Sequence, residues 1–88
     1  MTFEFDPYKS ESNKRKHGVD FNEIQALWNS ARVEVKSQVE GEMRYAVLGV
    51  FKKINYTVII SYRGSIIRIV SARPSVAKEI EIYEKYKK

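Results

Sequence analysis

The side chains best suited to chemistry in this chain are cationic. Lys16 is followed directly by His17, and histidine is the side-chain type that ordinarily titrates near neutral pH. Arg44, Arg68 and Arg73 follow later in the chain. Such a set can cleave RNA without a metal, because RNA brings its own nucleophile, the 2′-hydroxyl, and DNA does not. The reaction needs a base, an acid and cations around the phosphate in the transition state, and these residue types can supply all three.

Each of these side chains also has a simpler interpretation. His17 comes directly before Gly18, and a histidine at the C-terminal end of a helix is stabilised by the helix dipole. An arginine in a strand either pairs with an acid, such as Glu42 for Arg44, or is presented to a phosphate. The residue types alone leave both interpretations open.

Spacing restricts which side chains can meet. Alternation along a strand puts Arg73 on one face and Arg68 on the other, so one site can include both only near an edge or end of the sheet. Lys9, Asn13 and His17 follow one another at intervals of about one helical turn. They therefore predict a polar stripe that contacts either RNA or an acidic partner.

Composition limits the remaining chemistries. The 88 residues include one histidine and no cysteine, so a metal centre or a thiolate nucleophile is not expected, and we expect no cofactor. The net charge of +5 favours a polyanionic partner, although lysines and arginines also serve simply to keep a surface soluble. The length predicts a single domain over residues 1–88. Because we find neither a long apolar stretch nor a leader, we expect a cytoplasmic protein with no membrane contact.

Two helices are predicted before the first strand. Asp6 and Pro7 are typical of a helix start, and Gly18 of a helix end. A capping box at Asp20 and Glu23 predicts a second helix. Four side chains of that helix fall on one face and are predicted to be core: Phe21, Ile24, Leu27 and Trp28.

The rest of the chain alternates with the period of strands. Four successive strands joined by short turns are predicted near residues 32–39, 43–51, 56–62 and 66–72, which favours an antiparallel sheet. A last helix is expected from Pro74 or Ser75, with Val76, Ile80 and Tyr83 facing the sheet. The predicted class is therefore α+β, with two N-terminal helices, a four-stranded antiparallel sheet and a C-terminal helix.

In three blocks the sequence resembles the BrnT toxin family, whose members have a RelE-like fold. The first block runs from Asp6 through Lys9, Asn13 and Lys16-His17-Gly18-Val19 to Phe21 and Glu23; the second is Glu42-x-Arg44 with Gly49; the third is Arg68-Ile69-Val70-Ser71-Ala72-Arg73 with Glu79 and Tyr83. The chain departs from the family pattern at Phe5, where tryptophan is common, in the segment after Glu23, and at Pro74, which directly follows Arg73.

The resemblance implies a ribonuclease that inhibits translation, and a cognate antitoxin with a ribbon-helix-helix DNA-binding element. Toxin and antitoxin would form a hetero-oligomer that binds operator DNA through the antitoxin. By position, the blocks associated with activity contain the candidate catalytic residues Lys16, His17, Glu42, Arg44, Arg68 and Arg73. The candidate RNA-binding residues are Lys9, Asn13, Arg15 and Arg63.

A different class of function fits the same residues. The chain could act mainly as a binding module, a co-repressor that holds the antitoxin on DNA. In that case substitution of Lys16 or Arg73 by alanine would leave antitoxin binding intact and have no effect on growth arrest. A plain RNA-binding domain is a weaker alternative, because we recognise no exposed aromatic stacking motif.

Overall fold

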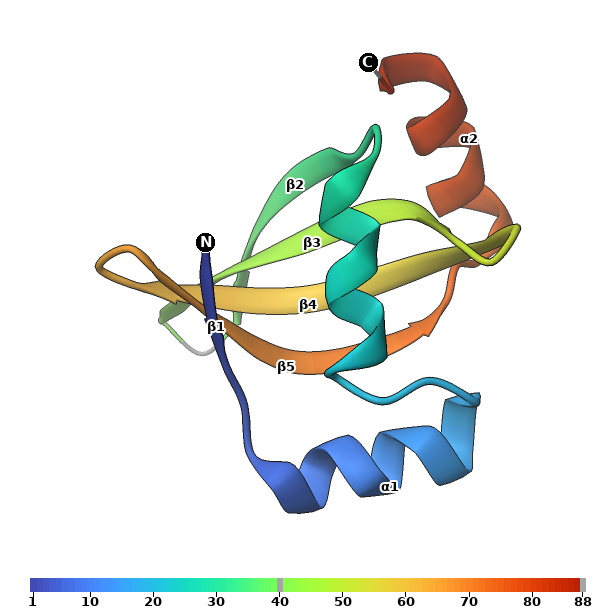
Figure 1. Cartoon of the computed structure of the whole chain (residues 1–88). Helices are drawn as coiled ribbons and strands as arrows, with labels where there is room; N and C mark the ends of the chain where they lie inside the picture. The colour runs from blue at the N-terminus through green and yellow to red at the C-terminus, as the bar shows by residue number, and fades with distance from the viewer. Residues whose placement is uncertain (40, 88) are drawn as a thin grey trace.

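The computed structural model describes residues 1–39 and 41–87, and within these ranges a five-stranded sheet carries three helical segments (Figure 1). The elements follow in the order β1 (Thr2–Glu4), α1 (Pro7–His17), η1 (Glu23–Asn29), β2 (Val33–Val39), β3 (Glu42–Phe51), β4 (Ile54–Arg63), β5 (Ile66–Pro74) and α2 (Ala77–Tyr86). The strands lie in the order β1-β5-β4-β3-β2. None of the described helices is long and apolar enough to cross a membrane.

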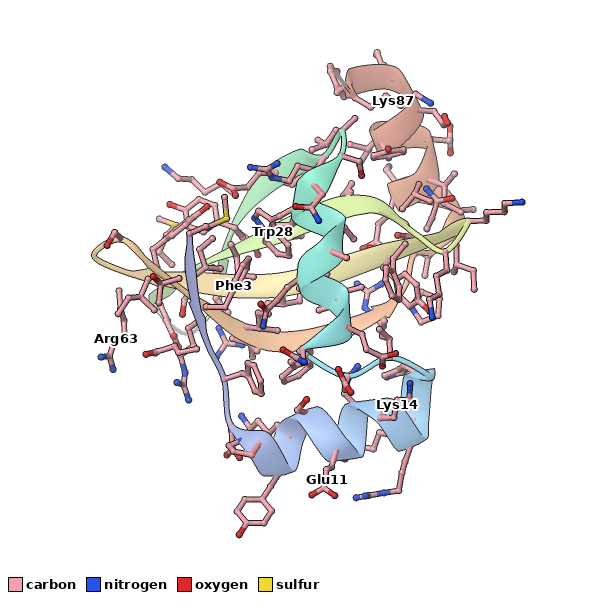
Figure 2. The ribbon with its side chains drawn as sticks, viewed as in Figure 1. Phe3, Glu11, Lys14, Trp28, Arg63 and Lys87 are labelled. Atoms are coloured by element: carbon pink, nitrogen blue, oxygen red, sulfur yellow. The ribbon has the colours of Figure 1, made fainter. Side chains whose placement is uncertain are left out.

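The predicted α+β class is confirmed, but the predicted sheet was wrong in one respect. The four predicted strands form an antiparallel meander, and β1 adds a fifth strand that runs parallel to β5. Because β1 has only three residues, it is too short to show a period. It is held in place by its partner strand and by Phe3, whose ring packs edge-on against Trp28 at 5.1 Å between centroids (Figure 2).

Helix α1 has almost no apolar face, and it docks through buried polar side chains. The Asp6 carboxylate accepts from the backbone N–H of Tyr8 at 2.9 Å, and Gly18 ends the helix at a φ of 80°. Ser10 and Asn13 are the buried residues of α1. The hydroxyl of Ser10 accepts from the backbone N–H of Phe21 at 2.9 Å. Hydrogen bonds to backbone therefore replace the usual hydrophobic stripe.

The second predicted helix forms as a 3₁₀ helix, η1. Its predicted capping box is confirmed, because Asp20 Oδ1 accepts from the backbone N–H of Glu23 at 2.7 Å and Glu23 Oε1 accepts from that of Asp20 at 3.0 Å. Helix η1 covers one face of the sheet (Figure 1). Leu27 fits over Gly49, where an added Cβ would lie 2.5 Å from a Leu27 methyl carbon. The core on this face includes the four predicted side chains of η1 and its approach, together with Val47, Val58, Ile60, Ile67, Ile69 and Ala72.

An irregularity in β5 changes which side chains share a face. The pairing of β4 with β5 shifts register between Ile59 and Ile60, so that Arg73 lies opposite Thr57 while Arg68 lies opposite Ser61. Because Thr57 and Ser61 are four residues apart in β4, they point to the same face. The prediction that Arg68 and Arg73 face opposite ways was therefore wrong, because one extra residue in β5 resets the alternation.

Helix α2 begins three residues after Pro74, slightly later than predicted, and closes one end of the sheet. Tyr83 is buried, and its hydroxyl donates to the carbonyl of Ala31 at 3.2 Å. At the same end of the sheet, the tight turn from β3 to β4 places Lys52 and Lys53 at φ values of 50° and 68° (Figure 1). Both are left-handed conformations that side chains other than glycine adopt at a cost.

Candidate active site

The sheet face opposite η1 carries a groove, which we call the sheet groove. Cross-strand pairing puts Ser37 beside Arg44, Val35 beside Ala46, and Ala46 beside Ile59. The groove has a volume of about 480 Å³ and is lined by these residues with Lys36, Tyr45, Ser71, Arg73 and Glu79. Its floor is apolar and its margin carries two guanidinium groups, so it combines a hydrophobic surface with cations.

A second hollow lies between α1 and β5, and we call it the helix hollow. It has a volume of about 230 Å³ and is lined by Lys9, Ser12, Asn13, Lys16, His17, Phe21, Val70 and Ser71. Ser71 lines both hollows. The two hollows therefore meet at β5, with cations of α1 in one and two arginines in the other.

Arg73 is held by a bidentate ion pair. Its Nη1 and Nη2 donate to Glu79 Oε1 and Oε2 at 2.8 and 2.9 Å. Glu79 Oε1 also accepts from the hydroxyl of Thr57 at 2.8 Å and from the backbone N–H of Val76 at 2.9 Å. These donors, the guanidinium above all, lower the pKa of Glu79 to about 2. The hydrogen bond to Glu79 also raises the pKa of Arg73, so the pair stays ionised and fixes the start of α2 to the end of β5.

Arg44 is held more loosely. Its Nη2 lies 3.3 Å from Glu42 Oε2, and the side chain of Glu42 is 56% exposed. Arg44 Nε is buried and has no hydrogen-bond partner among the described residues. An exposed pair of this kind contributes little, so Arg44 is the groove arginine less committed to an acid of the chain.

Arg68 and Arg63 lie elsewhere. Both contact Glu4 Oε2, Arg68 through Nη1 at 3.1 Å and Arg63 through Nε at 3.5 Å. Arg63 is at the end of β4 next to the hairpin that leads to β5, well away from α1 in Figure 2. Neither lines the sheet groove or the helix hollow. These two predicted site residues therefore form a separate cluster around β1.

The predicted stripe on α1 divides into exposed and buried parts. Lys9, Lys16 and His17 are exposed. Asn13 is buried, and its amide donates to the carbonyls of Val19 and Ala72 at 2.8 Å each and accepts from the backbone N–H of Ala72 at 3.2 Å. With its hydrogen-bonding atoms used in this way, Asn13 positions α1 against β5. Arg15 is exposed and lines a different hollow, with Ser10, Glu11, Lys14 and Asp20.

Two groups in the hollows escaped the sequence analysis as site residues. Ser71 was named only as part of a block, and Glu79 only through the resemblance. A signal for Glu79 does exist, because an acid three residues after an N-cap reaches back to the cap backbone. Ser71 has no local signal, since its place between the hollows depends on the docking of α1.

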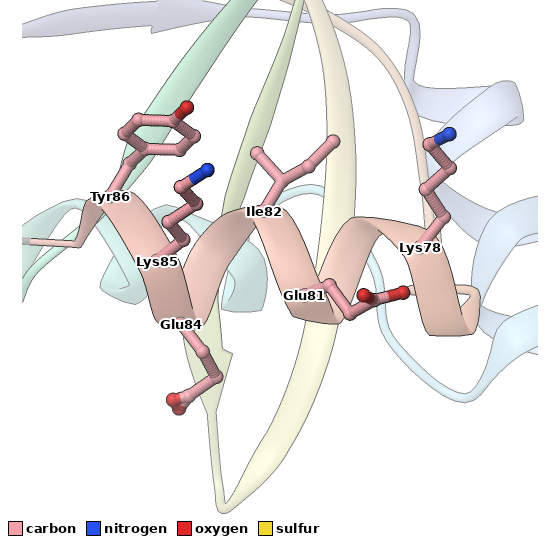
Figure 3. A pocket seen from close by; sticks show the side chains of 6 residues that line it. All are labelled: Lys78, Glu81, Ile82, Glu84, Lys85 and Tyr86. Carbon is pink, nitrogen blue, oxygen red and sulfur yellow. The ribbon is translucent and has the colours of Figure 1, made fainter.

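The outer surface of α2 lacks this combination. A larger hollow of about 680 Å³ runs along the outside of α2 (Figure 3) and contains Lys78, Glu81, Ile82, Glu84, Lys85 and Tyr86. Its acids and lysines balance, and it holds none of the predicted site residues. No three His, Cys, Asp or Glu side chains gather into a metal-binding group in the described part of the chain.

The fold and the two hollows define a small α+β domain that presents cations on both sides of one strand. The chain belongs to the BrnT family, described as ribonuclease toxins of type II toxin–antitoxin systems, whose sequence model matches residues 5–79. The match includes α1, the whole sheet after β1, and Glu79. No curated protein matches the chain.

Proposed function

We propose that this protein is a metal-independent endoribonuclease that inhibits translation by cleaving RNA. The observation that supports the proposal is the meeting of two cationic hollows at Ser71, because it gathers acid–base and phosphate-binding groups around one strand. Membership of a ribonuclease toxin family supplies the substrate class.

The chemistry uses the 2′-hydroxyl of the substrate as nucleophile. A base removes its proton, the oxygen attacks the neighbouring phosphorus, and the bond to the 5′-oxygen breaks as an acid donates a proton to it. His17 and Lys16, at the rim of the helix hollow, are the residues to which we assign these transfers. The products are a 2′,3′-cyclic phosphate and a free 5′-hydroxyl.

The arginines stabilise the charge that develops on the phosphate oxygens. Arg44 acts directly, since its ion pair is a single 3.3 Å contact with the exposed Glu42. Arg73 has five N–H donors, and Glu79 accepts one hydrogen bond from Nη1 and one from Nη2. We assign it an auxiliary contact and a structural role, and we assign no catalytic role to Arg68, Arg63 or Glu42.

The antitoxin completes the proposal. We expect a ribbon-helix-helix protein that forms a hetero-oligomer with this chain in the cytoplasm and binds operator DNA. Lys9 and Lys16 are exposed on α1, so an acidic antitoxin segment has cations to cover there. Charge reversal at either lysine should weaken antitoxin binding, and unchanged affinity would count against this docking site.

The test is incubation of purified protein with a defined RNA in EDTA, followed by analysis of the product ends. Wild-type protein should cleave, and the double variant Lys16→Ala, His17→Ala should not. Lys53→Gly is the matched control, because it removes one positive charge from a residue that lines neither hollow, and glycine accepts the φ of 68° there.

Three results are informative. Cyclic phosphate ends from wild type and control alone would support the proposal. Equal cleavage by the double variant would move the acid–base chemistry away from α1. Intact RNA with folded wild-type protein would favour the co-repressor function or a requirement for the ribosome.

A further inference from the structure

We propose that the sheet groove is a subsite for one unpaired nucleotide, with the base on its apolar floor and the phosphate at Arg44. The inference rests on the proposed function for the identity of the ligand as RNA. It concerns binding alone, so it can be tested with RNA that cannot be cleaved.

The floor suits a flat, largely apolar group. Val35, Ala46 and Ile59 stand side by side on adjacent strands of one sheet face. Val35 is 37% exposed, and the other two are partly exposed. Apolar side chains left open at the bottom of a groove gain from a ligand that removes them from water. Hydroxyls of Ser37 and Ser71 at the margin can reach polar atoms on the edge of a base.

The anionic part of the ligand has one preferred partner. The Arg73 and Glu79 charges neutralise each other in a bidentate pair. Arg44 has only an exposed pair at 3.3 Å and a buried, unpartnered Nε in the described structure. A phosphate can take two parallel hydrogen bonds from the accessible part of this guanidinium, which lacks the bidentate acid that engages Arg73. The phosphate of the bound nucleotide therefore belongs at Arg44.

The path of the strand follows from Ser71. Since this residue lines both hollows, RNA that fills the sheet groove can continue across β5 to Lys16 and His17. A base turned into the groove is unstacked and unpaired, which a duplex does not offer. The substrate class is thus single-stranded RNA, held over successive nucleotides.

The probe is a fluorescently labelled 2′-O-methyl RNA pentamer, which lacks a free 2′-hydroxyl and stays intact. Its affinity is measured by anisotropy at several salt concentrations for wild type, Arg44→Ala, Arg44→Lys and the charge control Lys53→Gly. Loss of one phosphate contact should lower the slope of log K against log salt by about 0.7. We expect this change and about a tenfold weaker affinity for Arg44→Ala, and partial recovery in Arg44→Lys, because lysine retains the charge and loses the fork.

A second measurement covers the floor and does not depend on a variant that folds. In wild-type protein with labelled methyl groups, the pentamer should shift the resonances of Val35, Ala46 and Ile59, and a duplex of the same sequence should not. Equal affinity and salt slope for Arg44→Ala and Lys53→Gly would overturn the subsite, as would methyl shifts confined to α2. A subsite that binds the pentamer while natural RNA stays intact would count against cleavage by the isolated protein and leave the subsite in place.

Discussion

The ion pair between Arg73 and Glu79 gives a quantitative prediction for the Glu79→Gln variant. In the folded protein the pKa of Glu79 falls from 4.5 to about 2. One pKa unit corresponds to about 1.4 kcal/mol, which sets a ceiling of about 3.5 kcal/mol on the stabilisation. The side chain of Arg73 is 38% exposed, and solvent screens a pair of this kind. We therefore expect Glu79→Gln to lower the free energy of unfolding by about 2 kcal/mol at pH 7.

The same pair predicts how the loss depends on pH. Because the pKa of Glu79 is lower in the folded state, its contribution is complete above the unfolded value of 4.5 and is lost as the pH falls toward 2. At pH 2.5 the difference between wild type and variant should shrink to about a quarter of its value at pH 7.

Urea unfolding followed by circular dichroism at pH 7 and at pH 2.5 measures both quantities. Glu81→Gln is the matched control, since Glu81 is an exposed acid on the same helix (Figure 3), and it should unfold with wild type at both values. A Glu79→Gln protein as stable as wild type at pH 7 would refute the reasoning. So would a deficit of the same size at both pH values, because that would indicate lost packing and not lost charge.

Three further predictions concern stability and share the same urea assay at pH 7. Gly49→Ala should lower the free energy of unfolding by about 1–3 kcal/mol, because the new Cβ would overlap Leu27. An unchanged urea midpoint would mean that Leu27 moves aside freely. Asn13→Ala should lower the free energy of unfolding by about 2–4 kcal/mol, because it leaves buried backbone groups of β5 without partners. Asn13→Ser should recover little of this loss. Full stability of Asn13→Ala would show that water replaces the amide. Replacing Lys52 and Lys53 by Asn and Gly should stabilise by about 1 kcal/mol, since that pair suits the left-handed turn, and a loss of stability would contradict the turn geometry.

Local signals in the sequence were enough for the helices and the long strands. Each helix signal is local: the cap at Asp6, the helix end at Gly18 and the capping box at Asp20 each involve a partner no more than four residues away. The four long strands show alternation over seven to ten residues. Strand β1 could not be predicted in the same way, because three residues gain their order from the distant β5.

The candidate site was less accessible to prediction for the same physical reason. Sequence reasoning left open whether each strand arginine pairs with an acid or faces a phosphate, and the outcome depends on contacts between separate elements. Arg73 meets Glu79 of α2, and Arg68 meets Glu4 of β1. The extra residue in β5 also turned Arg68 to the face of Arg73, and no local pattern of residue types marked it.

The docking of α1 on β5 has a consequence for the timing of toxicity during synthesis. The amide of Asn13 bonds to Ala72, and β1 pairs with Ile66–Arg68, so α1 and β1 lack these partners until β5 has been synthesised. Contacts this distant in sequence form late. A nascent or truncated chain without β5 therefore lacks the helix hollow, and the cell meets an assembled site only after β5 has been translated. With the antitoxin docking that we propose, an antitoxin that is already present then has the first opportunity to cover it.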